Sequence, residues 1–196
     1  YLRVFPIKEV ADIGRKKGIP LFIDNTASPV ICKPLAHGAA VVMHSLTKYI
    51  GGHGTSIGGI IVDGGNFDWT KDRKRQPLMN EPDQSYNGAI WADAVPKLTG
   101  ANIPFAIRAR VVLLRDLGAP LSPFNAFQII QGLETVALRM KQHCVNAEKV
   151  VAFLETQKKV TNVIYPTNHQ GEIKERAKRY MQGGYGSLVG MDVGTR

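Results

Sequence analysis

The sequence predicts a layered α/β fold, because short apolar segments alternate with a helical pattern. Residues 6–17 carry apolar side chains at helical spacing, and Gly18 follows at the position where a helix would end. Residues 20–24 and 39–43 are short apolar runs typical of buried strands in a parallel sheet, and residues 57–63 form a third strand candidate. In such sheets, ligands bind beyond the carboxyl ends of the strands.

The pattern changes after the third strand candidate. Residues 66–104 are irregular and rich in Pro, Gly and Asn, which predicts a long loop with short helices. Residues 107–117 predict a helix that a glycine ends. The composition shifts near residues 118–120, so we expect a domain boundary there. It would divide an α/β part at residues 1–119 from an α+β part at residues 120–196.

The expected α+β part opens with a helix start signal. Ser122 is a favoured capping residue, and Pro123 is favoured at the first helical position. The helical pattern continues to about Thr156, and Gly132 suggests a bend. Two strand candidates and one more helix follow, at 160–165, 187–193 and 172–182.

The composition limits the classes of function. The net charge is +9, yet the basic residues are scattered, and the densest run, at residues 71–75, contains an acid and no interleaved aromatic side chains. This arrangement disfavours a nucleic-acid interface and suits anionic small molecules. The apolar runs are shorter than the roughly 18 residues of a membrane span. We therefore expect neither nucleic acid nor a membrane as a partner.

The two cysteines, Cys32 and Cys144, are far apart in the sequence and form no CxxC pair. They predict unpaired thiols in a reducing compartment, and the five histidines lack zinc-ligand spacing, so no metal site is expected. The first residues contain no apolar signal core, which favours a cytoplasmic protein. The sequence does not begin with Met, which predicts a piece of a longer protein.

Four polar residues follow the first two strand candidates. Asp24 ends one apolar run, and Ser45, Thr47 and Lys48 follow the other. A lysine amine can bind an aldehyde cofactor as a Schiff base, a carboxylate can keep a pyridine nitrogen protonated, and hydroxyls can bind a phosphate. An enzyme that uses pyridoxal 5'-phosphate (PLP) requires these three kinds of group. The spacing alone leaves structural roles open, since such a lysine is usually a surface residue and the other three residue types often cap turns.

The motifs around these residues are more specific. Asp-Asn-Thr at 24–26 and Ser-Leu-Thr-Lys-Tyr-Ile-Gly-Gly-His at 45–53 resemble the marks of the Cys/Met-metabolism family of PLP-dependent enzymes. The resemblance runs the length of the chain, through residues 22–29, 37–54 and 58–69. Three further segments resemble the O-acetylhomoserine sulfhydrylase branch of the family, at 81–88, 108–143 and 163–166.

The resemblance implies a fold and a site. The fold is part of an aspartate-aminotransferase-like (fold type I) large domain, followed by part of a smaller α+β C-terminal domain. The implied cofactor is PLP, which Lys48 holds covalently while also moving protons. Asp24 is expected to pair with the pyridinium nitrogen, and Ser45 and Thr47 are expected to contact the phosphate.

The resemblance also implies a reaction, namely γ-replacement on O-acetylhomoserine. Sulfide or a thiol would displace acetate and give homocysteine or a relative, as in the transferases of methionine and cysteine metabolism. A homo-oligomer, a tetramer in the family, is the implied assembly. Two alternatives within the family are a γ-lyase and a cystathionine γ-synthase. An alternative of another class is a non-catalytic fragment that binds little cofactor.

Three parts of the family's site have no counterpart in this sequence. They are an N-terminal Tyr and Arg that reach a neighbouring subunit's phosphate, a stacking Tyr ahead of the aspartate, and a C-terminal Arg that binds the substrate carboxylate. Four arginines do not match the last of these, so we expect structural or surface roles for Arg108, Arg110, Arg115 and Arg139. A Gly-x-Ser-x-Gly pattern at 54–58 resembles that of serine hydrolases, but a β-rich segment follows it where that site needs a helix.

Overall fold

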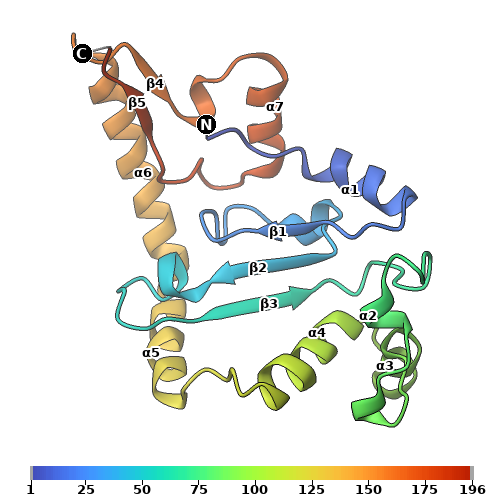
Figure 1. Cartoon of the computed structure of the whole chain (residues 1–196). Helices are drawn as coiled ribbons and strands as arrows, with labels where there is room; N and C mark the ends of the chain where they lie inside the picture. Colours follow the sequence, from blue (N-terminus) through green and yellow to red (C-terminus); the bar gives the residue numbers. More distant parts are fainter. Residues whose placement is uncertain (1, 195–196) are drawn as a thin grey trace.

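A three-stranded sheet forms the centre of the computed structural model, which describes residues 2–194 (Figure 1). Strand β2 (Val41–Ser45) lies between β1 (Phe22–Asp24) and β3 (Gly59–Asp63). β1 pairs with β2 in parallel and β3 pairs with β2 in antiparallel, so the expected parallel pairing holds for the first two strands. β2 begins two residues later than the apolar run suggested. Ala39 and Ala40 extended that run because they are buried, although they precede the strand.

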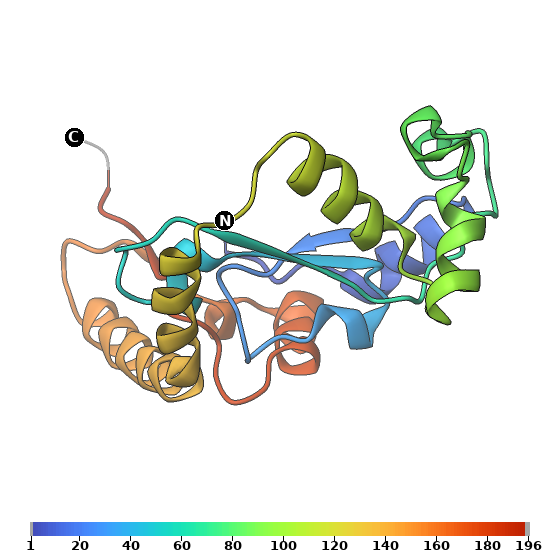
Figure 2. The ribbon, with the colours of Figure 1, turned by 90° about the horizontal axis from the view of Figure 1, so that it is seen from below.

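Helices cover both faces of this sheet (Figures 1 and 2). On one side lie α1 (Ile7–Lys16) and α7 (Gly171–Tyr180), together with the short helix η1 (Pro34–His37). Here Tyr180 and Ile7 pack against Val42 of β2. On the other side lie the following short helices and turns: α2 (Pro77–Asn80), η3 (Gln84–Tyr86), α3 (Trp91–Thr99), α4 (Pro104–Arg108) and η4 (Ala109–Asp116).

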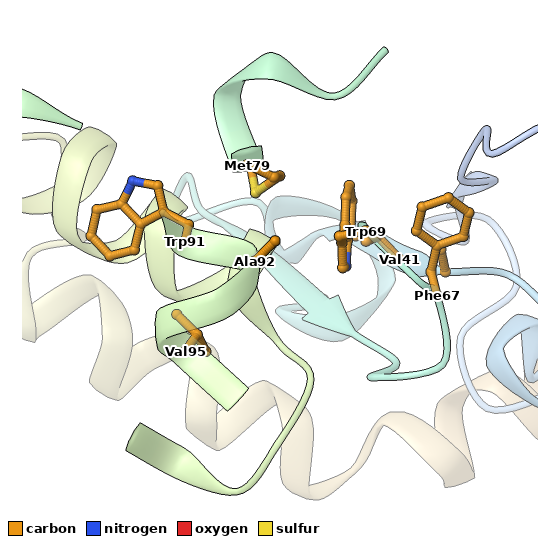
Figure 3. Packing of buried hydrophobic residues seen from close by; sticks show 8 residues of the cluster. Val41, Phe67, Trp69, Met79, Trp91, Ala92 and Val95 are labelled. Carbon is orange, nitrogen blue, oxygen red and sulfur yellow. The ribbon is translucent and has the colours of Figure 1, made fainter. Parts of the chain in front are cut away.

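The long segment between β3 and α4 is compact and builds a core of its own. Its aromatic residues Phe67, Trp69 and Trp91 are buried together with Met79, and Val41 of β2 joins them from the sheet (Figure 3). The indole of Trp91 donates a hydrogen bond to the Asp83 carboxylate over 3.0 Å. The expectation of a loop with short helices is thus correct in outline, although α3 is a full nine-residue helix.

Two consecutive helices, α5 (Pro123–Glu134) and α6 (Val136–Glu155), run along the end of the sheet where β2 terminates (Figure 1). Ser122 caps α5 as expected, since its hydroxyl accepts the Asn125 N–H over 3.1 Å. The break between the helices falls at Thr135, three residues after the expected bend. Gly132 is buried against the loop after β2, which explains why the small residue is needed just before the break.

A two-stranded antiparallel sheet, formed by β4 (Asn162–Ile164) and β5 (Gly190–Asp192), follows α6 and packs against it. The short helix η5 (Pro166–Asn168) connects β4 to α7. Tyr165 is fully buried and packs in one cluster with Ala147 and Val151 of α6. Its hydroxyl donates a hydrogen bond to the Gly186 carbonyl over 2.8 Å. The division of the chain at residues 119 and 120 stays a prediction.

One expectation about burial was wrong. β1 was expected to be a buried strand, yet Phe22 is 42% exposed, because β1 is an edge strand of the described sheet. β3 forms the other edge, and Ile60, Ile61 and Val62 are also exposed. Within residues 2–194, no helix combines the length and the apolar character that crossing a bilayer requires.

Candidate functional site

The turn that carries Lys48 begins directly after β2. Its five residues, Leu46–Ile50, form the short π-helical segment η2, and Lys48 departs from helical geometry with φ −90° and ψ −127°. Asp24 is the last residue of β1 and lies opposite Met43 of β2. Because β1 and β2 are parallel neighbours, their carboxyl ends meet at one edge of the sheet, as Figure 1 shows for the end of β2 beside α6.

A pocket of about 700 Å³ opens at this edge. Asp24 and Lys48 both line it, so the structure brings together the carboxylate and the amine that the sequence placed 24 residues apart. The volume lies in the range of small-molecule sites. The rest of the lining comes from the strand ends, the loop after Lys48, helix α6 and the segment before β5, and comprises Thr26, Ala27, Thr47, Tyr49, Gly52, Gly54, Arg139, His143 and Leu188.

Asp24 is held as a carboxylate by its own turn. The backbone N–H of Thr26 donates to Asp24 Oδ1 over 2.9 Å. Hydrogen bonds from the Thr26 side chain and backbone lower the pKa of Asp24 below its ordinary value, and the nearby His44 adds to this effect. Burial acts in the opposite direction but does not overcome them. Asp24 can therefore offer a negative charge to a protonated nitrogen in the pocket.

His44 precedes the Lys48 turn on β2, and its Nδ1 is buried without a hydrogen-bond partner among residues 2–194. Burial lowers the pKa of His44, while the charge of Asp24 opposes that shift. His44 is therefore a neutral neighbour of the Asp24 carboxylate near pH 7. The sequence interpretation gave His44 no role, because a single histidine in a strand carries no specific signal.

The hydroxyl residues of the site are placed differently from one another. Thr47 lines the pocket, and its Oγ1 accepts the N–H of Gly58 over 3.0 Å. Ser45 does not line it, and its backbone N–H donates to Thr26 Oγ1 over 2.7 Å. Thr26 thus bridges the ends of β1 and β2 and lines the pocket itself. The sequence interpretation did not single out Thr26, although the Asp-Asn-Thr motif contained it.

Helix α6 supplies a second wall that the sequence interpretation also missed. Arg139 and His143, one helical turn apart, both line the pocket. The His143 ring meets the Tyr49 ring edge to face, with centroids 5.6 Å apart. The Tyr49 hydroxyl in turn forms a 2.5 Å hydrogen bond with Ser187. Only the i, i+4 spacing could have indicated that Arg139 and His143 lie on the same face of a helix.

Two other features of this region do not form competing sites. An adjoining cavity of about 250 Å³ is lined mainly by apolar side chains and lacks Lys48. The serine of the Gly-x-Ser-x-Gly pattern, Ser56, is buried and bonded to Gln128, and β3 follows it. A hydrolase nucleophile needs an exposed hydroxyl on a strand–helix turn, so this serine is structural.

The donor set suits PLP. Lys48 supplies the amine, Asp24 a carboxylate of lowered pKa, and Thr26 and Thr47 hydroxyls, all around one pocket of sufficient size. Fold and site therefore define an α/β protein with a lysine–carboxylate pocket at the strand ends. The model of one family, the Cys/Met metabolism PLP-dependent enzymes, matches residues 1–196, and the chain belongs to this family.

The similar proteins are consistent with this membership. The chain is 46% identical to an O-acetyl-L-homoserine sulfhydrylase from Leptospira meyeri over 98% of its own length and 44% of that protein. It is 41% identical to a homocysteine synthase from Schizosaccharomyces pombe, over 93% of its length and 42% of that protein. The chain thus spans less than half the length of these relatives.

A solved structure from Campylobacter jejuni, described as an O-acetylhomoserine (thiol)-lyase, superposes with a TM-score of 0.83 and 35% identity. The superposition covers 97% of this chain and 46% of that one. That structure contains N'-pyridoxyl-lysine-5'-monophosphate, a lysine joined to the cofactor. The prediction of a partial fold type I enzyme is confirmed by this match together with the family.

Proposed function

We propose that the protein containing this chain is a PLP-dependent transferase that replaces the acetoxy group on the γ-carbon of O-acetylhomoserine by sulfide or a thiol, with release of acetate. The observation that carries the proposal is the shared pocket of Asp24 and Lys48 at the ends of two parallel strands. The names and identities of the Leptospira and fission yeast relatives support the choice of substrate. A cytoplasmic homo-oligomer with small-molecule partners is part of the same proposal.

Each residue has a proposed task. Lys48 would hold the cofactor through its amine, and Asp24 would keep the ring nitrogen protonated by its charge. Thr47 offers a hydroxyl for the phosphate, and Ser45 stays a candidate for the same task, while Thr26 holds the Asp24 carboxylate through its hydrogen bonds. When bound, PLP supplies an electron sink for a carbanion at the substrate's α-carbon. The free amine of Lys48 would take the α-proton. Loss of a β-proton would then let acetate leave the γ-carbon, and both protons would return once the sulfur nucleophile has added.

A substrate panel tests this proposal on the protein encoded by the whole reading frame. O-acetyl-L-homoserine with sulfide should give homocysteine and acetate in equal amounts. Methionine cleavage, and condensation of the same substrate with cysteine, measure the γ-lyase and cystathionine γ-synthase alternatives. Faster turnover in either of these two reactions would replace the proposal. Absence of PLP uptake would support a non-catalytic protein instead.

A further inference from the structure

Arg139 lies where α6 begins, and its guanidinium binds the turn that carries Lys48. Nη1 donates to the Tyr49 carbonyl over 2.6 Å, and Nη2 donates to the Ile50 carbonyl over 3.0 Å. Nη2 also donates to the Gly132 carbonyl of α5 over 2.6 Å, and Nε donates to Thr135 Oγ1 over 3.1 Å. One side chain therefore ties the two residues after Lys48 to the break between α5 and α6.

These bonds involve carbonyl groups at the ends of helices, and the Gly132 carbonyl also accepts the Thr135 N–H over 3.3 Å. Tyr49 and Ile50 are the last residues of η2, and Gly132 lies in the last turn of α5. The carbonyls of a final helical turn have no partner within their own helix. A planar guanidinium with a fork of donors can reach three of them at once, which the point charge of a lysine cannot do equally well.

The guanidinium packs closely against the backbone of Gly52. Gly52 has φ +78°, and a Cβ on it would lie 2.5 Å from Arg139 Nη1. A Cβ on Gly132 would lie 2.1 Å from the carbonyl oxygen of Gly51. The two glycines let the guanidinium and the Lys48 turn approach each other. We call Arg139, Gly52 and Gly132 the arginine clamp.

The hydrogen bonds also decide between two roles for Arg139. Four of its five N–H groups bind protein oxygens, at Thr135, Tyr49, Ile50 and Gly132. A two-pronged grip on a substrate carboxylate would require at least one of these bonds to break. Among the residues that the structure describes, no carboxylate forms an ion pair with Arg139. The guanidinium is thus committed to the backbone next to Lys48.

We propose that Arg139 is a positioning residue, which fixes the direction in which the Lys48 side chain leaves its turn toward Asp24. The backbone bends at Lys48 itself, and the clamp holds the two residues on the far side of that bend. Without the clamp, the amine would sample orientations that do not face the pocket. The proposal rests on the proposed function only in taking Lys48 as the residue that reacts with PLP.

The test separates positioning of Lys48 from cofactor binding in general. PLP is added to the apo form of the protein encoded by the whole reading frame, and its covalent capture is followed by absorbance. In parallel, the affinity for pyridoxamine 5'-phosphate is measured, because this amine analogue fills the pocket but cannot react with a lysine. The variants are Arg139→Met and Arg139→Lys. Arg179→Met is the control, since Arg179 forms an exposed ion pair with Glu9 and lies over the Tyr180 ring, and it does not line the Lys48 pocket.

For Arg139→Met we expect capture to slow by on the order of 10- to 100-fold, the loss that misplacement by about 1 Å can cause. Arg139→Lys should fall between wild type and Met, because lysine restores some but not all of the bonds. The pyridoxamine 5'-phosphate affinity should stay within about threefold of wild type. Gly52→Ala displaces the guanidinium without removing it, so it should slow capture as well and serves if Arg139→Met does not fold.

Three results would overturn the proposal. Unchanged capture in a folded Arg139 variant or in Gly52→Ala would show that the clamp is merely structural. An equal loss of pyridoxamine 5'-phosphate affinity would show that Arg139 binds the cofactor itself. A rise in KM for the amino-acid substrate with normal capture would make it a substrate anchor. Failure of Lys48→Ala to abolish capture in otherwise wild-type protein would instead refute the proposed function.

Discussion

The two walls of the pocket differ in how they are encoded. The sheet wall, with Asp24, Thr47 and Lys48, comes from residues within 24 positions of one another and carries the groups that can react. The helix wall, with Arg139 and His143, comes from about 90 positions further along and binds or contacts the turn of the first wall. Reactive groups thus sit at strand ends, while a helix that packs across those ends controls their orientation.

The largest effect should come from the sheet wall, through Lys48→Ala. This change removes both the covalent anchor and the proton carrier, so turnover should fall by about 10⁴-fold, the upper range for loss of one general base. Bound PLP should lose the absorbance of the lysine-bound form. Borohydride reduction of wild-type protein followed by peptide mapping checks the assignment directly. Label on another lysine, such as Lys33 or Lys71, would contradict it.

Asp24→Ala should leave the anchor intact and weaken the chemistry. We expect PLP to stay attached to Lys48 while kcat falls on the order of 100-fold, as when a preorganised electrostatic partner is lost. The pKa of Asp24 is lower in the folded protein than its ordinary value. Its charge is therefore fully present at and above the ordinary pKa, and it disappears only when the pH falls through the lowered pKa. The ratio of wild-type kcat to Asp24→Asn kcat should therefore stay constant as the pH falls through the ordinary pKa range of an aspartate, and Asp24→Asn should remain low at every pH. Equal kcat in wild type and Asp24→Asn would show that the Asp24 charge has no role in the reaction.

Gly132→Ala tests the helix wall through stability. The new methyl group would meet backbone atoms of Gly51, which cannot move away as a side-chain end could, so the cost should reach about 3 kcal/mol. The matched control is Gly59→Ala, where a Cβ would meet only the His44 carbonyl oxygen at an ordinary 3.7 Å. Urea unfolding of both variants measures the difference. Equal stability of the two would mean that α5 does not press on the Lys48 turn.

The smallest effect concerns Tyr165, which lies outside both walls. Burial raises the pKa of Tyr165 to about 12. The stability from its neutral form is complete below pH 10 and is lost as the pH rises from 10 through 12, by at most about 3 kcal/mol. Tyr165→Phe should remove this alkaline loss, while costing about 1 kcal/mol at neutral pH for the bond to Gly186.

Unfolding of wild type and Tyr165→Phe at pH 8 and pH 11 measures both terms. Activity at pH 8 should stay unchanged, because Tyr165 does not line the Lys48 pocket. Loss of activity in Tyr165→Phe would mean that the β4–β5 unit acts on the pocket and would weaken the contrast between the two walls. A stability difference that does not depend on pH would contradict the raised pKa.

The sequence by itself predicted the residues of the sheet wall. The spacing of apolar residues and the helix-capping and turn residues predicted α1, the cap at Ser122 and the strands that end at Asp24 and near Ser45. These features could be predicted because they depend on local backbone preferences. The motif around Lys48 then specified the family, which the family match confirmed. The roles of Asp24, Ser45, Thr47 and Lys48 stay predictions until the variants are measured.

Only the tertiary structure decided how the pocket is closed and held. The sequence suggested a structural or surface role for Arg139, and no local pattern shows that its donors reach backbone carbonyls 89 and 90 positions away. The same limit applies to Phe22, whose apolar run predicted burial but whose strand became an edge. Local preferences fix what a segment becomes, whereas contacts across the fold depend on which surfaces the packed elements bring together.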